Sequence, residues 1–177
     1  MTSITRSLTV SGAALAVAAP LALGFAPAGQ AQEVVGSPIE VPFDIKPQSC
    51  PNPLELKKKE ETPAAILGMA DLDVTDIDPD TVKLVGVKPL RFTFEDVATP
   101  FVPFIGKSAP SDCTREGADG FTDLSLKFDN QAVVQAVQKK LGRPLETNAV
   151  VILTVTAELF DGTPLIGEDV MVVRKSD

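Results

Sequence analysis

The chain has no histidine, no tryptophan and no tyrosine, and it has only two cysteines among its 177 residues. Without histidine, a Ser-His or Cys-His nucleophile pair cannot form, and histidine-ligated zinc or iron sites are excluded. Two cysteines alone cannot complete a tetrahedral zinc site. An aromatic surface for stacking sugars would have to come from phenylalanine. Any catalysis would therefore rest on carboxylate, lysine or serine chemistry.

Positive charge is also scarce, since 16 Lys and Arg stand against 24 Asp and Glu and give a net charge of −8. A surface of this sign repels nucleic acid, and the sequence has no basic patch that would offset the repulsion. We therefore expect no nucleic-acid partner. Cations are the natural counter-partners of such a surface.

Long apolar runs are missing except near the N-terminus. Arg6 precedes the apolar residues 8–26, and a small-residue stretch, APAGQA, follows directly. This order predicts a secretory signal peptide over residues 1–31, cleaved after Ala31 or after Ala28.

A membrane anchor is the alternative interpretation of this segment, because its apolar run is nearly long enough to span a bilayer. Pro20, Gly24 and the cleavage-like stretch favour removal. We expect a mature chain of residues 32–177 that forms a single domain of ordinary size, is secreted or periplasmic, and has no stable membrane insertion.

The two cysteines, Cys50 and Cys113, belong to a chain that we expect to be exported to an oxidising compartment. An even pair in that setting predicts a disulfide. Closing a loop of about 63 residues would stabilise the fold by on the order of 4 kcal/mol in the chain-entropy model.

Apolar and polar residues alternate along much of the chain, which is typical of half-buried strands. In IEVPFDIK, residues 39–46, the four branched or aromatic side chains fall on one face. Further strands are expected at residues 63–74, 82–87, 90–96, 124–128, 149–160 and 168–175.

Helical spacing occurs once, in NQAVVQAVQKKLG, which predicts a helix over about residues 130–141 with Gly142 as its stop. The Asp78-Pro79 pair suits the start of a helix and predicts a short helical turn near residues 78–82. Many short strands with one helix predict a mainly β protein, an antiparallel Ig-like β-sandwich.

The segment TPFVPFIGKSAPSDC is apolar, rich in proline and irregular, and it predicts a long loop pinned by Cys113. Its apolar stretch from Phe101 to Ile105 has two interpretations. It is either a loop tucked over a sandwich edge, which we favour, or an exposed patch for a partner.

Several segments, taken in order, resemble a module that recurs in secreted bacterial proteins of mostly unknown function. These segments are DIKPQSCPNPL, PAAILG, DVTDIDPDTV, EDVATP, EGADGFTDLSLKF and LFDGTPLIGED. Members of this group are predicted Ig-like sandwiches, sometimes attached to other extracellular modules. The resemblance implies the same fold and an extracellular setting, and it implies little about function.

Many relatives of this module carry a compact acidic run before the LxLxF strand that looks like a calcium loop. Calcium takes six to eight oxygen ligands, and an alternating acidic turn with a glycine supplies them. Around TREGADGFTDLSLKF, one alignment leaves Asp119 and Asp123 as side-chain ligands. A second alignment instead uses Asp112, Thr114, Glu116 and Asp123, and a third brings Asp96 to Asp119 and Asp123 across the long loop.

The alternative is that Asp119-Gly120 is a tight turn and Asp123 a residue at a strand edge. Both interpretations stay open from the sequence. A weak site is not disqualified by a poor loop, because extracellular calcium modules commonly bind at about 10⁻⁴–10⁻³ M.

The function predicted from these features is an exported, non-catalytic β-sandwich module with a structural, adhesive or recognition role, which binds an extracellular protein or a glycan. Weak calcium binding would stabilise it. The alternatives are a carbohydrate-binding module and a glycoside hydrolase that uses two carboxylates such as Glu95 and Glu116.

Overall fold

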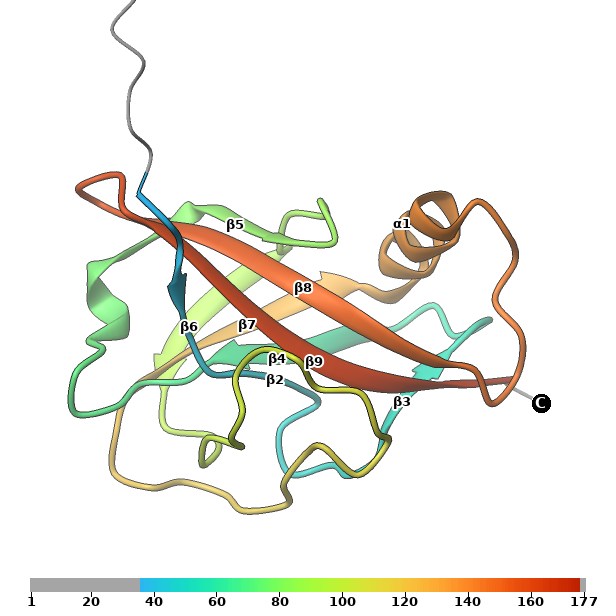
Figure 1. The fold of residues 1–177 in the computed structure, drawn as a ribbon, viewed down its shortest axis with the longest axis horizontal. Helices are drawn as coiled ribbons and strands as arrows, with labels where there is room; N and C mark the ends of the chain where they lie inside the picture. Colours follow the sequence, from blue (N-terminus) through green and yellow to red (C-terminus); the bar gives the residue numbers. More distant parts are fainter. Residues whose placement is uncertain (1–35, 176–177) are drawn as a thin grey trace, which may run out of the picture. The chain divides into compact units, whose positions relative to one another are not determined.

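Two β-sheets lie face to face in residues 36–175, the part of the chain that the computed structural model describes (Figure 1). The predicted signal peptide lies outside these residues. The larger sheet holds β1 (Ile39–Glu40), β3 (Asn52–Glu55), β5 (Ile77–Leu84), β8 (Val150–Leu159) and β9 (Pro164–Arg174). The smaller sheet holds β2 (Phe43–Ile45), β4 (Glu61–Ile66), β6 (Arg91–Glu95) and β7 (Asp123–Asp129). The predicted mainly β sandwich is confirmed.

The core lies between the two sheets and follows from the alternation of side chains along the strands. In β7, Leu124, Leu126 and Phe128 point inward and are fully buried. In β8, the inward positions are Val151, Leu153, Val155 and Ala157. Burying each large apolar side chain contributes about 1.5–3 kcal/mol, so this inner layer is the main source of stability.

The first predicted strand divides between the sheets. β1 pairs with β9 and β2 pairs with β4. Between them, the amide of Val41 donates to the carbonyl of Ile166, and the chain passes over Gly167 so closely that a Cβ there would lie 2.8 Å from the Val41 oxygen. Glycine is required at this crossing because any side chain would collide with the backbone.

One sheet edge departs from the predicted antiparallel pairing. β1 and β3 both run parallel to β9, whereas the other strand pairs are antiparallel. The cause is the excursion between these two strands: the chain leaves the edge of β9 to form β2 in the other sheet and then returns in the same direction.

The predicted helix is confirmed as α1 (Asn130–Leu141). The Asp129 side chain accepts a hydrogen bond from the Ala132 amide at 2.8 Å and caps the first turn. Gly142 adopts a left-handed φ of 66° and ends the helix. Its buried valines pack onto the core, while Leu141 in the last turn is 45% exposed.

The predicted helical turn near residues 78–82 is wrong in position. These residues belong to β5, and the short 3-10 helix lies earlier, at Val74–Asp76, with Asp73 as its cap. Pairing with β8 buries Ile77 and Val82 and overrides the local preference. The tendency of Asp78-Pro79 to form a turn is still visible within β5. The pairing with β8 shifts register between Asp78 and Lys83, and the Asp78 side chain accepts a hydrogen bond from the Asp80 amide there.

Residues 96–122 join β6 to β7 without helix or strand, as the proline-rich composition predicts. We call this segment the long loop. Its start packs on the smaller sheet, where Val97 and Ala98 contact Ala65 and Leu67. Farther on, the amide of Glu168 in β9 donates to the carbonyl of Phe104. The long loop therefore runs along the side of the sandwich where β2 and β9 lie together.

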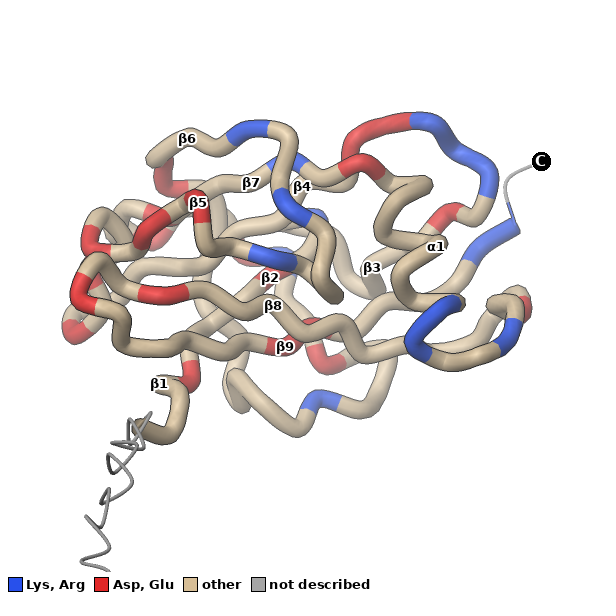
Figure 2. Tube along the Cα trace, turned by 90° about the horizontal axis from the view of Figure 1, so that it is seen from above, with Lys and Arg blue, Asp and Glu red and all other residues tan. Residues whose placement is uncertain are grey.

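Charge is unevenly distributed over the described residues. Figure 2 shows Lys and Arg gathered toward the end that holds α1, while Asp and Glu are more frequent at the opposite end, where β8 turns into β9. No helix in the described part of the chain is long and apolar enough to span a membrane.

Candidate functional site

The most unusual feature of the molecule is an ion pair inside the sandwich, beneath the long loop. The Lys107 ammonium lies 3.1 Å from a carboxylate oxygen of Asp169, and the two side chains are only 2% and 1% exposed. The same ammonium donates to the carbonyl of Phe43 at 3.1 Å and lies 5.6 Å from the centre of the Phe101 ring. The lysine thus reaches from an irregular loop to the edge of β2 and the interior of β9.

Asp169 occupies an inward position of β9, in line with Leu165 and Met171, where an apolar residue is the norm. Its second oxygen accepts from the Ile45 amide at 2.7 Å and from the Asn52 side chain at 2.9 Å. Burial raises the pKa of Asp169, while the neighbouring ammonium opposes that rise. The carboxylate therefore ties together both sheets and the long loop.

Asp44, on the outward side of β2, is the second buried acid. Burial, reinforced by the negative charge of Asp169, raises the pKa of Asp44 to about 8. One of its oxygens has no hydrogen-bond partner, and the residue is 5% exposed. A carboxyl in this setting is protonated at neutral pH, because burying a second unpaired negative charge costs more than keeping the proton.

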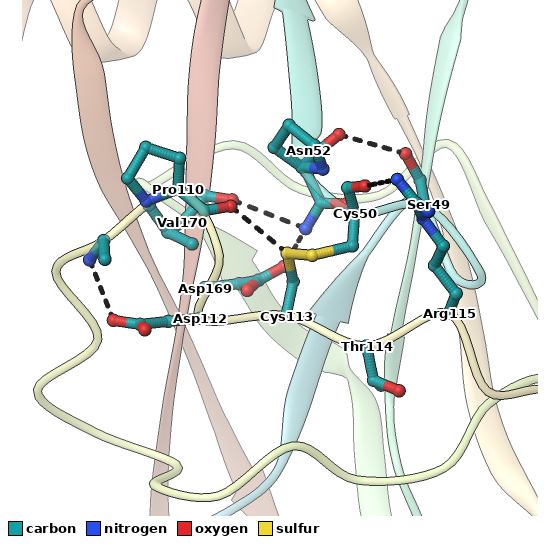
Figure 3. Close-up of a disulfide and its surroundings, with 12 residues drawn as sticks. Ser49, Cys50, Asn52, Pro110, Asp112, Cys113, Thr114, Arg115, Asp169 and Val170 are labelled. Atoms are coloured by element: carbon teal, nitrogen blue, oxygen red, sulfur yellow. Dashed lines mark hydrogen bonds between the residues drawn. A yellow bond between two sulfur atoms is a disulfide. The ribbon is translucent and has the colours of Figure 1, made fainter.

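The predicted disulfide between Cys50 and Cys113 is confirmed, with Cα atoms 5.5 Å apart. Figure 3 shows Asn52 and Asp169 beside it. The Asn52 side chain also donates to the carbonyl of Val170 at 3.4 Å. The disulfide therefore fixes the far part of the long loop next to the buried ion pair.

Side chains of the long loop complete this anchorage. The Asp112 carboxylate accepts from the amides of Ser108 and Ala109, each at 2.8 Å, and these bonds lower the pKa of Asp112. The Arg115 guanidinium donates to the carbonyl of Cys50 (Figure 3). A surface pocket of about 640 Å³ opens here, lined by Cys50, Pro51, Pro110, Ser111, Cys113, Thr114, Arg115 and Glu116. It offers apolar rings, hydroxyls and both signs of charge.

The third calcium alignment placed Asp96 near Asp119, and the structure does bring Asp96 to the turn that holds Asp119. The contact, however, uses the backbone: the Asp96 oxygens accept from the amides of Asp119 and Gly120 at 3.0 and 2.8 Å. Asp119 itself accepts from the Phe121 amide at 3.0 Å. These carboxylates therefore stabilise a tight turn.

Asp123, the other principal calcium candidate, is fully buried at the start of β7. Its oxygens accept from the amides of Gly68, Val97 and Ala98 at 2.9, 2.8 and 3.2 Å. Burial raises the pKa of Asp123, and the three amides lower it. Asp123 thus fastens the beginning of the long loop to the chain that follows β4.

The candidate ligands do not combine into a calcium loop. Asp112 and Asp123 are occupied by backbone amides in separate places, and Glu116 lines the pocket by the disulfide. Within residues 36–175, no three acidic or cysteine side chains are grouped so that they would hold a metal ion. The prediction of calcium binding from the sequence is untested, and the carboxylates of Asp96, Asp112, Asp119 and Asp123 accept hydrogen bonds from backbone amides.

Glu95 and Glu116, the carboxylate pair considered for glycoside hydrolysis, do not have the properties that this reaction requires. Hydrogen bonds from the Ser125 and Thr93 hydroxyls lower the pKa of Glu95, whereas a general acid needs a raised pKa. Glu116 lies in the long loop, where its carbonyl oxygen accepts from the Thr99 amide. Among residues 36–175, the carboxyl groups with a raised pKa are instead Asp44, Asp123 and Asp169.

The sequence did not single out Lys107, Asp169, Asp44 or Asn52. A signal was present in two of them, since a lysine stands inside an apolar loop and an acid interrupts the apolar run of β9. Neither pattern says that the two residues meet. Comparison with protein-family models, with characterised proteins and with solved structures gave no match, so the resemblance to a secreted bacterial module stays a prediction.

Proposed function

We propose that the chain is an exported, non-catalytic β-sandwich module that recognises a segment of an extracellular protein, and that the long loop is its recognition surface. The observation that carries this proposal is the buried ion pair between Lys107 and Asp169. Burying two charges costs several kcal/mol per ion before their attraction offsets it, and an apolar pair would often be as stable. We infer that the pair specifies one loop conformation.

The long loop is held at three places along its length. Asp123 holds its start, the ion pair holds its middle, and the disulfide at Cys113 holds its far part. Long irregular loops in compact domains are usually functional, and a loop held in one conformation loses less entropy on binding. The anchorage therefore favours a binding role.

The exposed parts of the long loop favour a protein partner over a sugar. Val102 is 73% exposed and Phe121 42% exposed, and the pocket by the disulfide combines Pro51 and Pro110 with Arg115. Proline rings with a guanidinium and the Glu116 carboxylate beside them suit an extended peptide with polar or charged groups. A sugar site would need exposed aromatic platforms, which this pocket does not have among its lining residues.

An oxidising compartment is part of the proposal. The disulfide would be reduced in a typical cytosol, and its loss would release the loop. Export and the signal peptide over residues 1–31 stay predictions, and the cleaved N-terminus of the secreted protein, read by mass spectrometry, tests them.

The binding proposal is tested with a photo-crosslinking residue placed at Val102. The matched control carries the same residue at Phe160, which is 70% exposed in the turn between β8 and β9. Both proteins are irradiated with the extracellular proteins of the producing cells. We expect a defined adduct from position 102 that weakens when Arg115→Ala is combined with it.

Equal labelling from positions 102 and 160, or labelling that ignores Arg115→Ala, would contradict the proposal. Binding to an array of glycans, or turnover of a polysaccharide that disappears in Glu95→Gln, would instead support the carbohydrate-directed alternatives. Each outcome is read against the melting temperature of the same variant, so that unfolding is not mistaken for lost binding.

A further inference from the structure

Three of the four sheet edges in residues 36–175 are protected against pairing with another strand. An unprotected edge strand offers a row of free backbone groups to any further strand, and proteins block such edges with proline, bulges, short strands, charged side chains or covering loops. β5 contains Pro79 and the register shift between Asp78 and Lys83. That edge is interrupted in its middle.

The other two protected edges are short or covered. β1 and β3 have two and four residues, and Pro53 lies in the second. β2 has three buried residues, and the carbonyl of Phe43 is bonded by Lys107 from the long loop. Neither edge presents a continuous run of free backbone.

β6, at the edge of the smaller sheet, contains no proline and no register shift, and its two charged residues, Arg91 and Glu95, stand at its ends. Its five residues, Arg-Phe-Thr-Phe-Glu, are all exposed and pair with β7 in regular register. Phe92 and Phe94 are each 44% exposed, and their rings meet edge to face at 6.0 Å. An uninterrupted strand edge with two exposed aromatic rings is unusual where no further strand pairs with its outer side.

We propose that β6 pairs antiparallel with β6 of a second copy of this chain, with Thr93 at the centre. This register places Arg91 opposite Glu95 of the second copy, and Phe92 opposite Phe94 of the second copy. The two-fold axis repeats each pair, giving two ion pairs and two aromatic pairs from five residues. The smaller sheets of the two copies then form one continuous eight-stranded sheet.

The side-chain directions agree with this register. Residues opposite one another in a sheet point to the same face, and successive residues alternate. Phe92 and Phe94 are aligned with the inward Leu126 and Leu124 of β7, so the four rings of the dimer gather on the core side. The charged pairs gather on the outer side, where the Arg91 guanidinium also bonds Glu61.

The charge order of β6 favours a second copy in this orientation. A strand that begins with Arg91 and ends with Glu95 is complementary to itself only when antiparallel, since a parallel pair would place like charges together. Opposite charges across a strand pair stabilise it, and like charges destabilise it. A five-residue strand pair is a small interface, so we expect a weak dimer.

The test uses charge reversal at the two ends of β6 in the full mature domain. Sedimentation velocity is measured over protein concentrations from about 10 μM to about 1 mM, the range for a weak association. We expect a monomer–dimer equilibrium for the wild type. Arg91→Glu and Glu95→Arg should each weaken the dimer about tenfold, because each replaces two attractive pairs with two repulsive ones.

Mixing the two single variants should restore association, because R91E leaves an acid at both ends of β6 and E95R leaves a base at both ends. The double variant R91E/E95R should also dimerise, since its charges are exchanged within one strand. Lys83→Glu on the edge of β5 changes the charge equally to Arg91→Glu and is the control, expected to leave the dimer unchanged. The melting temperature in dilute solution shows that each variant folds.

A wild type that stays monomeric at about 1 mM, the upper end of the weak-association range, overturns the proposal. A dimer that neither reversal weakens, or that mixing fails to restore, overturns this register. These outcomes are independent of the recognition role of the long loop, which is measured at position 102.

Discussion

Lys107 and Asp169 lie 62 positions apart in the sequence, yet their charged groups meet at 3.1 Å inside the sandwich. One comes from a loop without regular structure and the other from an inward position of β9. The ion pair therefore makes the conformation of the long loop part of the folded core, and a change at either residue should alter the stability of the whole domain.

Removing one partner of the buried ion pair should destabilise the domain strongly. Lys107→Met leaves the Asp169 carboxylate without its countercharge, and Asp169→Asn leaves the ammonium unpaired. We expect each to lower the free energy of unfolding by about 3–5 kcal/mol, measured by urea denaturation. The double variant should lose less than the sum of the two, because it leaves no isolated charge in the interior.

The exposed ion pair between Arg91 and Glu61 is the matched control. Glu61→Gln should change the free energy of unfolding by less than about 1 kcal/mol, because exposed pairs contribute little. If Lys107→Met also lowered the free energy of unfolding by less than about 1 kcal/mol, the buried ion pair would not be what holds the long loop.

Stability should fall as the pH rises from about 4 toward about 8. Asp44 has a pKa raised to about 8 in the folded protein, so the folded state keeps a proton that the unfolded chain has already released. Stability therefore falls with pH across this window, at up to about 1.4 kcal/mol per pH unit from one such group. The raised pKa values of Asp169 and Asp123 act in the same direction.

Asp44→Asn should flatten this dependence, since an amide does not titrate. Urea denaturation at several pH values across the same window measures the slope for both proteins. An unchanged slope in the variant, or a wild type that gains stability over this range, would contradict the assignment of a protonated carboxyl to Asp44.

Removing the disulfide should cost the domain on the order of 4 kcal/mol, because the Cys50–Cys113 bond closes a loop with a sequence separation of 63. Cys50→Ser/Cys113→Ser is compared with the oxidised wild type by urea denaturation. Crosslinking from position 102 should weaken in the same variant if the disulfide fixes the loop. A stability loss below about 1 kcal/mol would mean that the other anchors suffice.

Millimolar calcium should leave the melting temperature nearly unchanged relative to chelator. The Asp123 oxygens are bonded by three backbone amides, and Asp96 and Asp119 hold a turn. Asp123→Asn should therefore destabilise the domain equally with and without calcium, by about 2–4 kcal/mol. A calcium-dependent rise that disappears in Asp119→Ala/Asp123→Ala would restore the calcium site, since a ligand of the folded state raises its melting temperature.

The sequence predicts features that depend on neighbouring residues better than features that depend on residues far apart in the chain. The period of two placed most strands, and the helix with its stop at Gly142 was found nearly to the residue, because these signals lie within a few neighbouring positions. The predicted turn at Asp78 failed because the pairing of β5 with β8 took those residues into a sheet.

The sequence by itself determined the alternating core, the helix and the pair of cysteines, since side-chain period, capping and cysteine count are local or compositional properties. Only the tertiary structure decided that Lys107 meets Asp169, that Asp123 fastens the loop and that the edge of β6 stays open. The reason is physical. Whether a buried charge is paired and whether a strand edge is free depend on the groups that lie opposite them in space, and the neighbouring residues in the sequence do not specify those groups.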